Sequence, residues 1–360
     1  MILLVLALAS IPSLPLGIQS KDLPQVAPPH AAERVQALRE RCEGFLAAEH
    51  VVGMGVAVLR KGELVFESAF GQSDREAARA ARESTLYRLA SVSKPVTATL
   101  VMQLVEQGKL ELDVGVAKYV PGLEPALGAV TLRQILSHTS GIRHYQLGRI
   151  DNSVEHRTTE QALGLFVKDP LLFQPGAKYS YSTHAFTLAA AAVERAAAKD
   201  LGALMAERIG PGAPRLSLEV LADEKPERAA LYRRNGADVQ RSEPREDLSW
   251  KYGGGGMEST ARDLARFADL VLRAELVSAA SRDAMWTRSR TSDGKELEYG
   301  LGWAVGEKGK LVQHGGSQQG ASSSLSILRE SGLVVVVLTN TEGGNAPELG
   351  QALRQILTAP

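Results

Sequence analysis

The sequence predicts an α+β fold: an antiparallel sheet, built from both ends of the chain and flanked by helices, with a helical domain inserted between its two parts. Short β-rich runs occur near both ends of the chain, at residues 52–59, 64–70, 299–305, 311–314, 321–328 and 333–338. Helical periodicity dominates between them, and no repeat of fixed period is visible. We therefore expect a sheet domain from residues 21–85 and 255–360 and a mainly helical domain from residues 86–254.

The composition favours chemistry on small molecules or peptides. A chain of 360 residues suits one large domain or two interleaved domains. Its 41 lysines and arginines balance 41 aspartates and glutamates, so there is no basic field for nucleic acid. We expect a small-molecule or peptide substrate and no nucleic-acid partner, and nothing in the sequence indicates self-association.

The N-terminal segment is typical of an exported protein. Residues 1–16 are almost wholly apolar, but Pro12 and Pro15 interrupt the run before the roughly 20 residues that a membrane-spanning helix needs. We expect a signal peptide over residues 1–20 and a periplasmic or secreted protein. No lysine or arginine precedes the apolar run, and no Ala-x-Ala cleavage site follows it. An uncleaved anchor that tethers the chain weakly to a membrane, or a misassigned start, therefore stays an alternative.

Each expected helix is marked by apolar periodicity. The first, over residues 31–49, places Cys42 beside Leu38, so this single cysteine is expected to be a buried apolar filler without a disulfide. The first two β-rich runs form a hairpin around residues 60–63. Further helices are expected over 91–108, 131–136, 186–198, 260 onward and 346–357. The charged, proline-bearing segment 211–250 is expected to form loops and short strands.

The start of the 91–108 helix carries the first candidate motif, Ser91-Val92-Ser93-Lys94. Three residues are nearly one helical turn, so the Lys94 amine can reach the Ser91 hydroxyl. A lysine with a lowered pKa can take the proton of a serine nucleophile, and a helix start favours negative charge beside it. Ser93 is a weaker candidate because it points about 100° around the helix from Lys94. Taken alone, the pattern also fits an N-cap serine followed by a solvated lysine.

Tyr181-Ser182-Thr183 is the second candidate element. A phenol beside a lysine ammonium is pushed toward phenolate. We therefore expect Tyr181 to act as general base for the serine or for water, and as general acid toward the leaving group. The alternative is a core tyrosine whose hydroxyl is satisfied by a neighbour.

His314-Gly315-Gly316-Ser317, at the end of a predicted strand, is the third. The glycines, Gly316 among them, permit close approach of a ligand backbone, and the NH of Ser317 together with that of Ser91 can form an oxyanion hole. The alternative is a simple turn between strands.

Other reaction classes lack their motifs. The chain has no Gly-x-Ser-x-Gly elbow and no P-loop, and the glycine run at residues 253–256 has Glu258 where a dinucleotide fingerprint needs its last glycine. His138 and His144 are six residues apart with no carboxylate pattern between them, which is not a zinc spacing. We therefore expect no metal and no cofactor.

Together, the three motifs occur in the order and at the approximate separations found in the serine β-lactamase and penicillin-binding-protein superfamily. The chain resembles its class C-related branch over about residues 38–357. Residues 141–145, 169–173 and 181–183 look most like the mitochondrial serine β-lactamase-like proteins. The resemblance implies a β-lactamase/transpeptidase-like fold.

The resemblance also implies roles for individual residues. Ser91 would be the acylated nucleophile, Lys94 its activating partner and Tyr181 the general acid or base. The NH groups of Ser91 and Ser317 would hold the oxyanion. His314 would take the position at which true β-lactamases have a lysine.

Two departures from the family pattern bear on the substrate. Thr183 stands where the family usually has an asparagine, so an amide that binds a substrate carbonyl is lost. His314 replaces a permanently charged group that would bind a β-lactam carboxylate. Both departures favour an ester or peptide substrate.

Three hypotheses follow from the motifs and the resemblance. The first is a serine hydrolase that forms an acyl-enzyme at Ser91 on a peptide or ester. The second is a β-lactamase or DD-peptidase, which cephalosporin turnover with and without His314→Lys would separate from the first. The third is a non-catalytic penicillin- or cell-wall-fragment-binding protein, which would show slow stoichiometric acylation without release.

Overall fold

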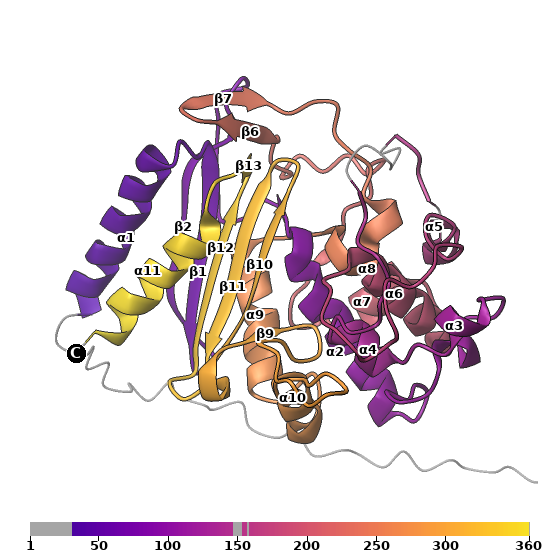
Figure 1. Ribbon diagram of the computed structural model, residues 1–360. Coiled ribbons are helices and arrows are strands. Elements are labelled where there is room, and N and C mark those ends of the chain that lie inside the picture. The colour runs from indigo at the N-terminus through magenta and orange to yellow at the C-terminus, as the bar shows by residue number, and fades with distance from the viewer. Residues whose placement is uncertain (1–30, 147–152, 157, 360) are drawn as a thin grey trace, which may run out of the picture.

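A seven-stranded antiparallel sheet lies at the centre of the protein (Figure 1), whose structure is a computed structural model that describes residues 31–146, 153–156 and 158–359. The strand order is β3-β2-β1-β12-β11-β10-β9, so strands from the start and the end of the chain lie side by side. The strands are β1 (Gly53–Arg60), β2 (Glu63–Asp74), β3 (Arg79–Ala80), β9 (Ala304–Val305), β10 (Leu311–Gln318), β11 (Ala321–Leu328) and β12 (Leu333–Thr339). The α+β prediction, with a sheet from both chain ends, is confirmed.

Helices cover both faces of this sheet (Figure 1). Helices α1 (Ala31–Ala48) and α11 (Ala346–Thr358) lie on one face, and α9 (Ala261–Leu272) lies on the other. The remaining helices are α2 (Ser93–Glu106), α3 (Pro125–Gly128), α4 (Leu132–Leu136), α5 (Thr159–Leu163), α6 (Thr183–Ala197), α7 (Leu201–Arg208), α8 (Tyr252–Gly255) and α10 (Ala279–Met285). Short 3-10 turns are η1 (Ala90–Val92), η2 (Val116–Lys118), η3 (Ser249–Lys251) and η4 (Glu307–Gly309).

Two small three-stranded sheets complete the described structure. One has the order β4-β8-β5, with β4 (Tyr87–Arg88), β8 (Met257–Ser259) and β5 (Ser217–Leu218). The other has the order β13-β6-β7, with β13 (Thr341–Glu342), β6 (Tyr232–Asn235) and β7 (Asp238–Arg241). The predicted signal peptide, residues 1–20, lies outside the described residues. Across the residues that are described, no helix combines the length and the apolar character needed to cross a membrane.

Strand β12 separates two apolar cores. Its side chains alternate between faces, so Val335 and Val337 pack with α1 and α11, whereas Val334 and Val336 face the helices of the other side. The first core includes Cys42, which is fully buried as expected, and burial raises the pKa of its thiol to about 12. The second core continues into α2, α6 and α9, which fixes the helical region against the sheet.

Three predicted boundaries are wrong. The expected strand over 299–305 is reduced to β9, and the strand expected to end at His314 continues through the glycines to Gln318. Pairing with β11 along this whole stretch outweighs the low strand propensity of glycine. The helix expected from residue 186 begins at Thr183, because the Ser182 side chain accepts a hydrogen bond from the Ala185 NH and caps it.

Candidate active site

Ser91 lies in η1, the 3-10 turn that precedes α2, rather than in the first turn of the α-helix. Backbone hydrogen bonding anchors this turn: Leu89 donates its NH to Met257 O over 2.8 Å and accepts from Ser323 Oγ over 2.7 Å. Ala90 is held at φ 49°, the left-handed region that costs a non-glycine residue about 1 kcal/mol or more. Ser91 is therefore presented, partly exposed, on a strained and anchored turn.

Lys94 is the neighbour of Ser91 one turn along, as predicted from the motif. Its Nζ lies 3.2 Å from Ser91 Oγ and donates to Gly254 O over 2.7 Å and to Thr183 Oγ1 over 3.2 Å. The side chain is fully buried, and this burial, together with the charge of Lys251, holds its pKa well below 10.5. A buried amine with a lowered pKa is suited to accept a proton from a serine.

Tyr181 approaches Ser91 from the other side, and its hydroxyl donates a hydrogen bond to Ser91 Oγ over 2.7 Å. Burial raises the pKa of this phenol above its ordinary value, although the Ser91 hydrogen bond lowers it. The expectation that a lysine ammonium would push Tyr181 toward phenolate is therefore wrong, because Lys94 is itself biased toward its neutral form. Tyr181 is a proton donor at Ser91.

Two histidines hold the Tyr181 segment in place. The Ser182 NH donates to His138 Nδ1 and the Thr183 NH donates to His144 Nδ1, each over 3.1 Å. The Tyr181 ring packs on the His138 ring with centroids 4.3 Å apart. The Nδ1 atom of each histidine accepts a hydrogen bond and so carries no proton, which means that both rings are neutral. Burial also lowers the pKa of His144 to about 4. Neither contact could be inferred from the spacing of these histidines.

Thr183 and the glycine run at residues 253–256 pack against the Lys94 side chain. A side chain on Gly254 would lie 2.7 Å from Thr183 Cγ2, and one on Gly253 would lie 2.6 Å from Phe186 O. The glycines therefore let α8 pack directly on α6, which brings the Gly254 carbonyl to the Lys94 amine. The glycine run at residues 253–256, which lacks the pattern of a dinucleotide-binding motif, thus supplies a hydrogen-bond acceptor for the Lys94 amine.

Strand β10 brings the third motif against the turn that carries Ser91. A side chain on Gly316 would lie 2.6 Å from Leu89 O and 2.9 Å from the Ser91 nitrogen. Only glycine allows this approach, which brings the neighbouring Ser317 to the edge of the site, where it is exposed. Ser317 thus lies beside Ser91 across the contact between strand and turn.

His314 is part of the same strand, but its side chain is already engaged. Its Nδ1 lies 2.7 Å from the Gly315 carbonyl, so this nitrogen carries the proton, and its Nε2 accepts from the Tyr299 hydroxyl over 2.8 Å. Burial, with the charge of Lys94, lowers the pKa of His314 to about 3. His314 is therefore a neutral, satisfied group rather than a cation available to a substrate.

Sequence reasoning missed Lys251, a second buried lysine close to the site. It is 4% exposed, and burial followed by the charge of Arg88 lowers its pKa to about 8. Its Nζ lies 4.9 Å from the centroid of the Trp250 ring and 5.4 Å from that of the Tyr145 ring. The segment 211–250 was expected to form surface loops, and no local pattern marks the residue that follows it as buried.

Ser93, the weaker candidate for the nucleophile, is bonded to backbone groups. Its hydroxyl donates to Ala90 O over 2.8 Å and accepts from the Met257 NH over 3.3 Å, and the residue is fully buried. Ser93 thus serves to hold the Ser91 turn.

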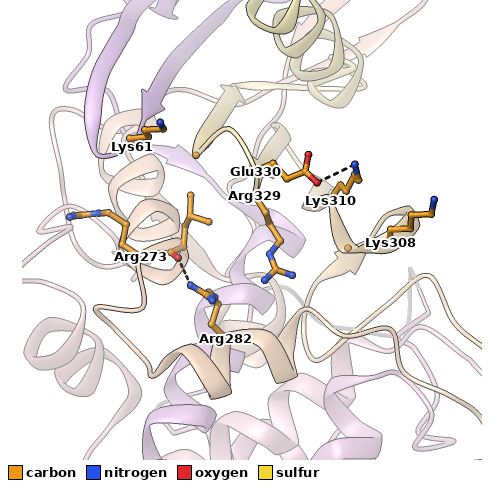
Figure 2. Close-up of a pocket in the computed structure, with 10 residues that line it drawn as sticks. Lys61, Arg273, Arg282, Lys308, Lys310, Arg329 and Glu330 are labelled. Atoms are coloured by element: carbon orange, nitrogen blue, oxygen red, sulfur yellow. Dashed lines mark hydrogen bonds and ion pairs between the residues drawn. The ribbon is translucent and has the colours of Figure 1, made fainter.

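A strongly basic pocket lies elsewhere, at the end of the sheet near α10 (Figure 2). It has a volume of about 550 Å³ and is lined by six cations, but not by Ser91, Lys94 or Tyr181. Four of its cations are engaged: Arg273 with Asp269, Arg282 with the Leu272 carbonyl, Arg329 with Asp283 and Lys310 with Glu330. The carboxylates in these contacts are those of Asp269, Asp283 and Glu330. Among the described residues, no cluster of three or more His, Cys, Asp or Glu could hold a metal ion.

Comparisons with known proteins extend over most of the described fold. The sequence profile of the beta-lactamase family matches residues 38–359. Esterase EstB of Burkholderia gladioli is 32% identical over 90% of this chain and 93% of its own length. The mitochondrial serine beta-lactamase-like protein LACTB of Bos taurus is 27% identical over 91% of this chain and 81% of its own. A D-stereospecific amidohydrolase from Streptomyces sp. superimposes with a TM-score of 0.72 at 25% identity, covering 91% and 99% of the two chains.

Proposed function

The chain is a serine hydrolase of the beta-lactamase family, and we propose that it cleaves an ester or peptide bond through an acyl-enzyme formed at Ser91. One observation carries the proposal: Ser91 Oγ lies between an amine 3.2 Å away and a phenol 2.7 Å away, and these groups come from separate segments of the chain. Such a set provides a nucleophile, a base and an acid within hydrogen-bond reach of one another.

In the proposed acylation, the neutral amine of Lys94 takes the proton of Ser91 as Oγ attacks the substrate carbonyl carbon. The Gly254 and Thr183 contacts use the NH bonds of Lys94 and leave its lone pair toward Ser91. As the bond to the leaving group breaks, the Tyr181 hydroxyl gives its proton to the alcohol or amine, and the Lys94 ammonium returns a proton to the Tyr181 oxygen. In sum, the proton that leaves Ser91 departs with the alcohol or amine, and the acyl group stays on Oγ.

In the proposed deacylation, a water molecule replaces the leaving group. The neutral amine of Lys94 accepts a proton from the water as its oxygen attacks the acyl carbon, and the Lys94 ammonium gives that proton to Ser91 Oγ as the bond to it breaks. The carboxylic acid is released and the free enzyme is restored. The NH groups of Ser91 and Ser317 are assigned to the oxyanion in both steps, supported by the close approach of β10 at Gly316.

The structure favours esters or peptides over β-lactam antibiotics as substrates. A neutral His314, bonded to Tyr299 and Gly315, is a poor partner for the β-lactam carboxylate. The similarity to esterase EstB points the same way. We also propose that the N-terminal segment directs export, which fractionation of cells that express the full chain would test.

The first prediction concerns acylation of Ser91. A fluorophosphonate probe is expected to label the wild type stoichiometrically and to leave Ser91→Ala unlabelled. Ser93→Ala is the matched control, since Ser93 is a serine two residues away that bonds only backbone groups. It is expected to label, more slowly than the wild type because the Ser91 turn loses two hydrogen bonds, and mass spectrometry of the labelled peptide should place the adduct on Ser91. Labelling of Ser91→Ala equal to that of the wild type would contradict the mechanism.

A further inference from the structure

Lys251 is a buried cation without a polar partner in the described part of the chain. Its Nζ makes no hydrogen bond and no ion pair there, and it lies over the faces of the Trp250 and Tyr145 rings. Buried lysines are almost always paired, because an unpaired charge loses its hydration. The aromatic faces replace part of that hydration but supply no negative charge.

A second unpartnered donor lies beside it. Gln318, the last residue of β10, is 9% exposed, and its Nε2 has no hydrogen-bond partner among the described residues. A side chain built on Gly255 would lie 3.4 Å from Lys251 Cδ and 3.6 Å from Gln318 Oε1, so the glycine separates the two side chains. The absence of a side chain at this position leaves room between them.

The strand geometry relates these donors to the proposed nucleophile. Side chains two residues apart lie on the same face of a strand, so Gln318 shares a face with Gly316, which abuts the Ser91 nitrogen. The separation along the strand is about 7 Å. His314 lies two residues from Gly316 in the opposite direction, next to Tyr299. Lys251 and Gln318 thus lie along β10 on the side of Ser91 away from His314.

The carboxylates of Glu246, Glu219 and Glu342 lie near enough to Lys251 to raise its pKa, but none of them bonds to its Nζ in the described part of the chain. The nearby carboxylate of Glu219 already pairs with both Arg88 and Arg245, with N–O distances of 2.8 and 2.7 Å. Lys94 is biased toward its neutral form, as are His144 and His314. A ligand carboxylate would supply the hydrogen-bond acceptor atoms that Lys251 and the Gln318 amide lack among the described residues.

We propose that Lys251 and Gln318 bind a carboxylate on the acyl part of the substrate, so that the enzyme prefers acyl groups that carry a free carboxylate a few bonds from the scissile carbonyl. The inference rests on the proposed function, because it assigns a substrate class to the same site. Lys251 would supply the charge and Gln318 a directional hydrogen bond. Tyr145 and Trp250 would form the wall that orients the lysine.

Two esters of equal shape test the proposal. Monomethyl glutarate carries the free carboxylate, and methyl glutaramate carries an uncharged amide in its place. The wild type is expected to hydrolyse the first with a kcat/KM at least tenfold higher, mainly through a lower KM. In Lys251→Met the ratio of the two kcat/KM values is expected to collapse to about one through a rise in KM for the acid, and in Lys251→Arg the ratio should be largely restored. Gln318→Met should lower the ratio by a smaller factor.

The readout is a ratio, so a general loss of folded enzyme affects both esters and leaves it unchanged. If turnover of both esters is too slow to follow, their protection of Ser91 against fluorophosphonate labelling gives the same comparison. Equal handling of the two esters by the wild type, or a preference that survives in Lys251→Met, would overturn the inference. Ser91 labelling in those same samples reports separately on the proposed function, which fails only if Ser91 is not labelled.

Discussion

At the residue scale, one physical cause acts with opposite signs on the two groups beside Ser91. Burial disfavours the charged form of each group. The charged form of an amine is protonated, so burial lowers the pKa of Lys94; the charged form of a phenol is deprotonated, so burial raises the pKa of Tyr181. Both groups are thereby biased to be neutral, with a lone pair on one side of Ser91 and a donor hydrogen on the other.

This arrangement predicts a pH profile for ester hydrolysis. The deprotonated amine is the active base, so kcat/KM should rise with pH through the Lys94 pKa, well below 10.5, and stay level above it. Lys94→Met is expected to lose about 10²–10⁴-fold in kcat/KM together with this acid limb. In Tyr181→Phe, kcat/KM should be lower than in the wild type but should still rise with pH in the same range. Initial rates of ester hydrolysis from about pH 5 to about pH 10 measure this profile. If kcat/KM of Lys94→Met still rises with pH as in the wild type, another group is the base.

At the element scale, β10 is the part of the sheet that completes the site. Its second half pairs with β11 from His314 to Gln318, and the missing side chain of Gly316 lets it touch the turn that presents Ser91. Neither the strand nor the turn forms the proposed oxyanion hole alone. Their relative position therefore matters more than the stability of either.

Gly316→Ala is expected to separate β10 from the Ser91 turn. The added methyl would lie 2.4 Å from Ser323 Oγ and 2.6 Å from Leu89 O, so backbone must shift. Loss of an oxyanion donor typically lowers kcat by about 10²–10³-fold. Gly315→Ala is the matched control, since its methyl would meet nothing closer than 3.4 Å. Ester kinetics and thermal unfolding of both variants measure the effect, and a Gly316→Ala enzyme with wild-type kcat would contradict it.

Elements with a strong local signal were predictable from the sequence. The β1–β2 hairpin, β11, β12 and the terminal helices follow from alternating or helical apolar patterns. The second half of β10 was not predictable, because two glycines hide a strand that is specified by its neighbours. The proximity of Ser91 and Lys94 is a local spacing and could be predicted, whereas the surroundings of Lys251 depend on Tyr145 and Gln318, which are distant in sequence and come near it only in the folded chain.

At the scale of the whole molecule, buried polar groups link segments that are far apart in sequence. Arg88 on β4 pairs with Glu219 and also donates to the carbonyl of Gln319, beyond the end of β10. Arg245 pairs with the same carboxylate. These contacts join the two parts of the fold behind the candidate site, and they leave two cations on one anion. The arrangement of charges behind the site is thus a property of the assembled fold rather than of one motif.

Acid stability of the fold should depend on its buried histidines, of which His184 in α6 is the clearest. It is fully buried, neither ring nitrogen has a partner among the described residues, and its ring stacks on Phe166 with centroids 4.5 Å apart. Burial, followed by the charge of Arg143, lowers its pKa to about 3, against about 6.5 in an unfolded chain. Between these values the unfolded state binds the extra proton, so the free energy of unfolding falls as pH falls, by about 1.4 kcal/mol per pH unit for this one group.

His184→Phe should remove this pH-dependent contribution to the free energy of unfolding while keeping a ring stacked on Phe166. Relative to the wild type, the variant is expected to gain about 2 kcal/mol in free energy of unfolding between about pH 7.5 and about pH 5. Urea unfolding at the two pH values measures the change, and because it is a difference between pH values, any packing cost of the larger ring cancels. His50→Asn, at an exposed histidine, is the control for the loss of a histidine side chain. If the free energy of unfolding of His184→Phe falls with acid as steeply as that of the wild type, protonation of His184 on unfolding is not the cause. The loss of stability in acid would then come from the histidines at the candidate site.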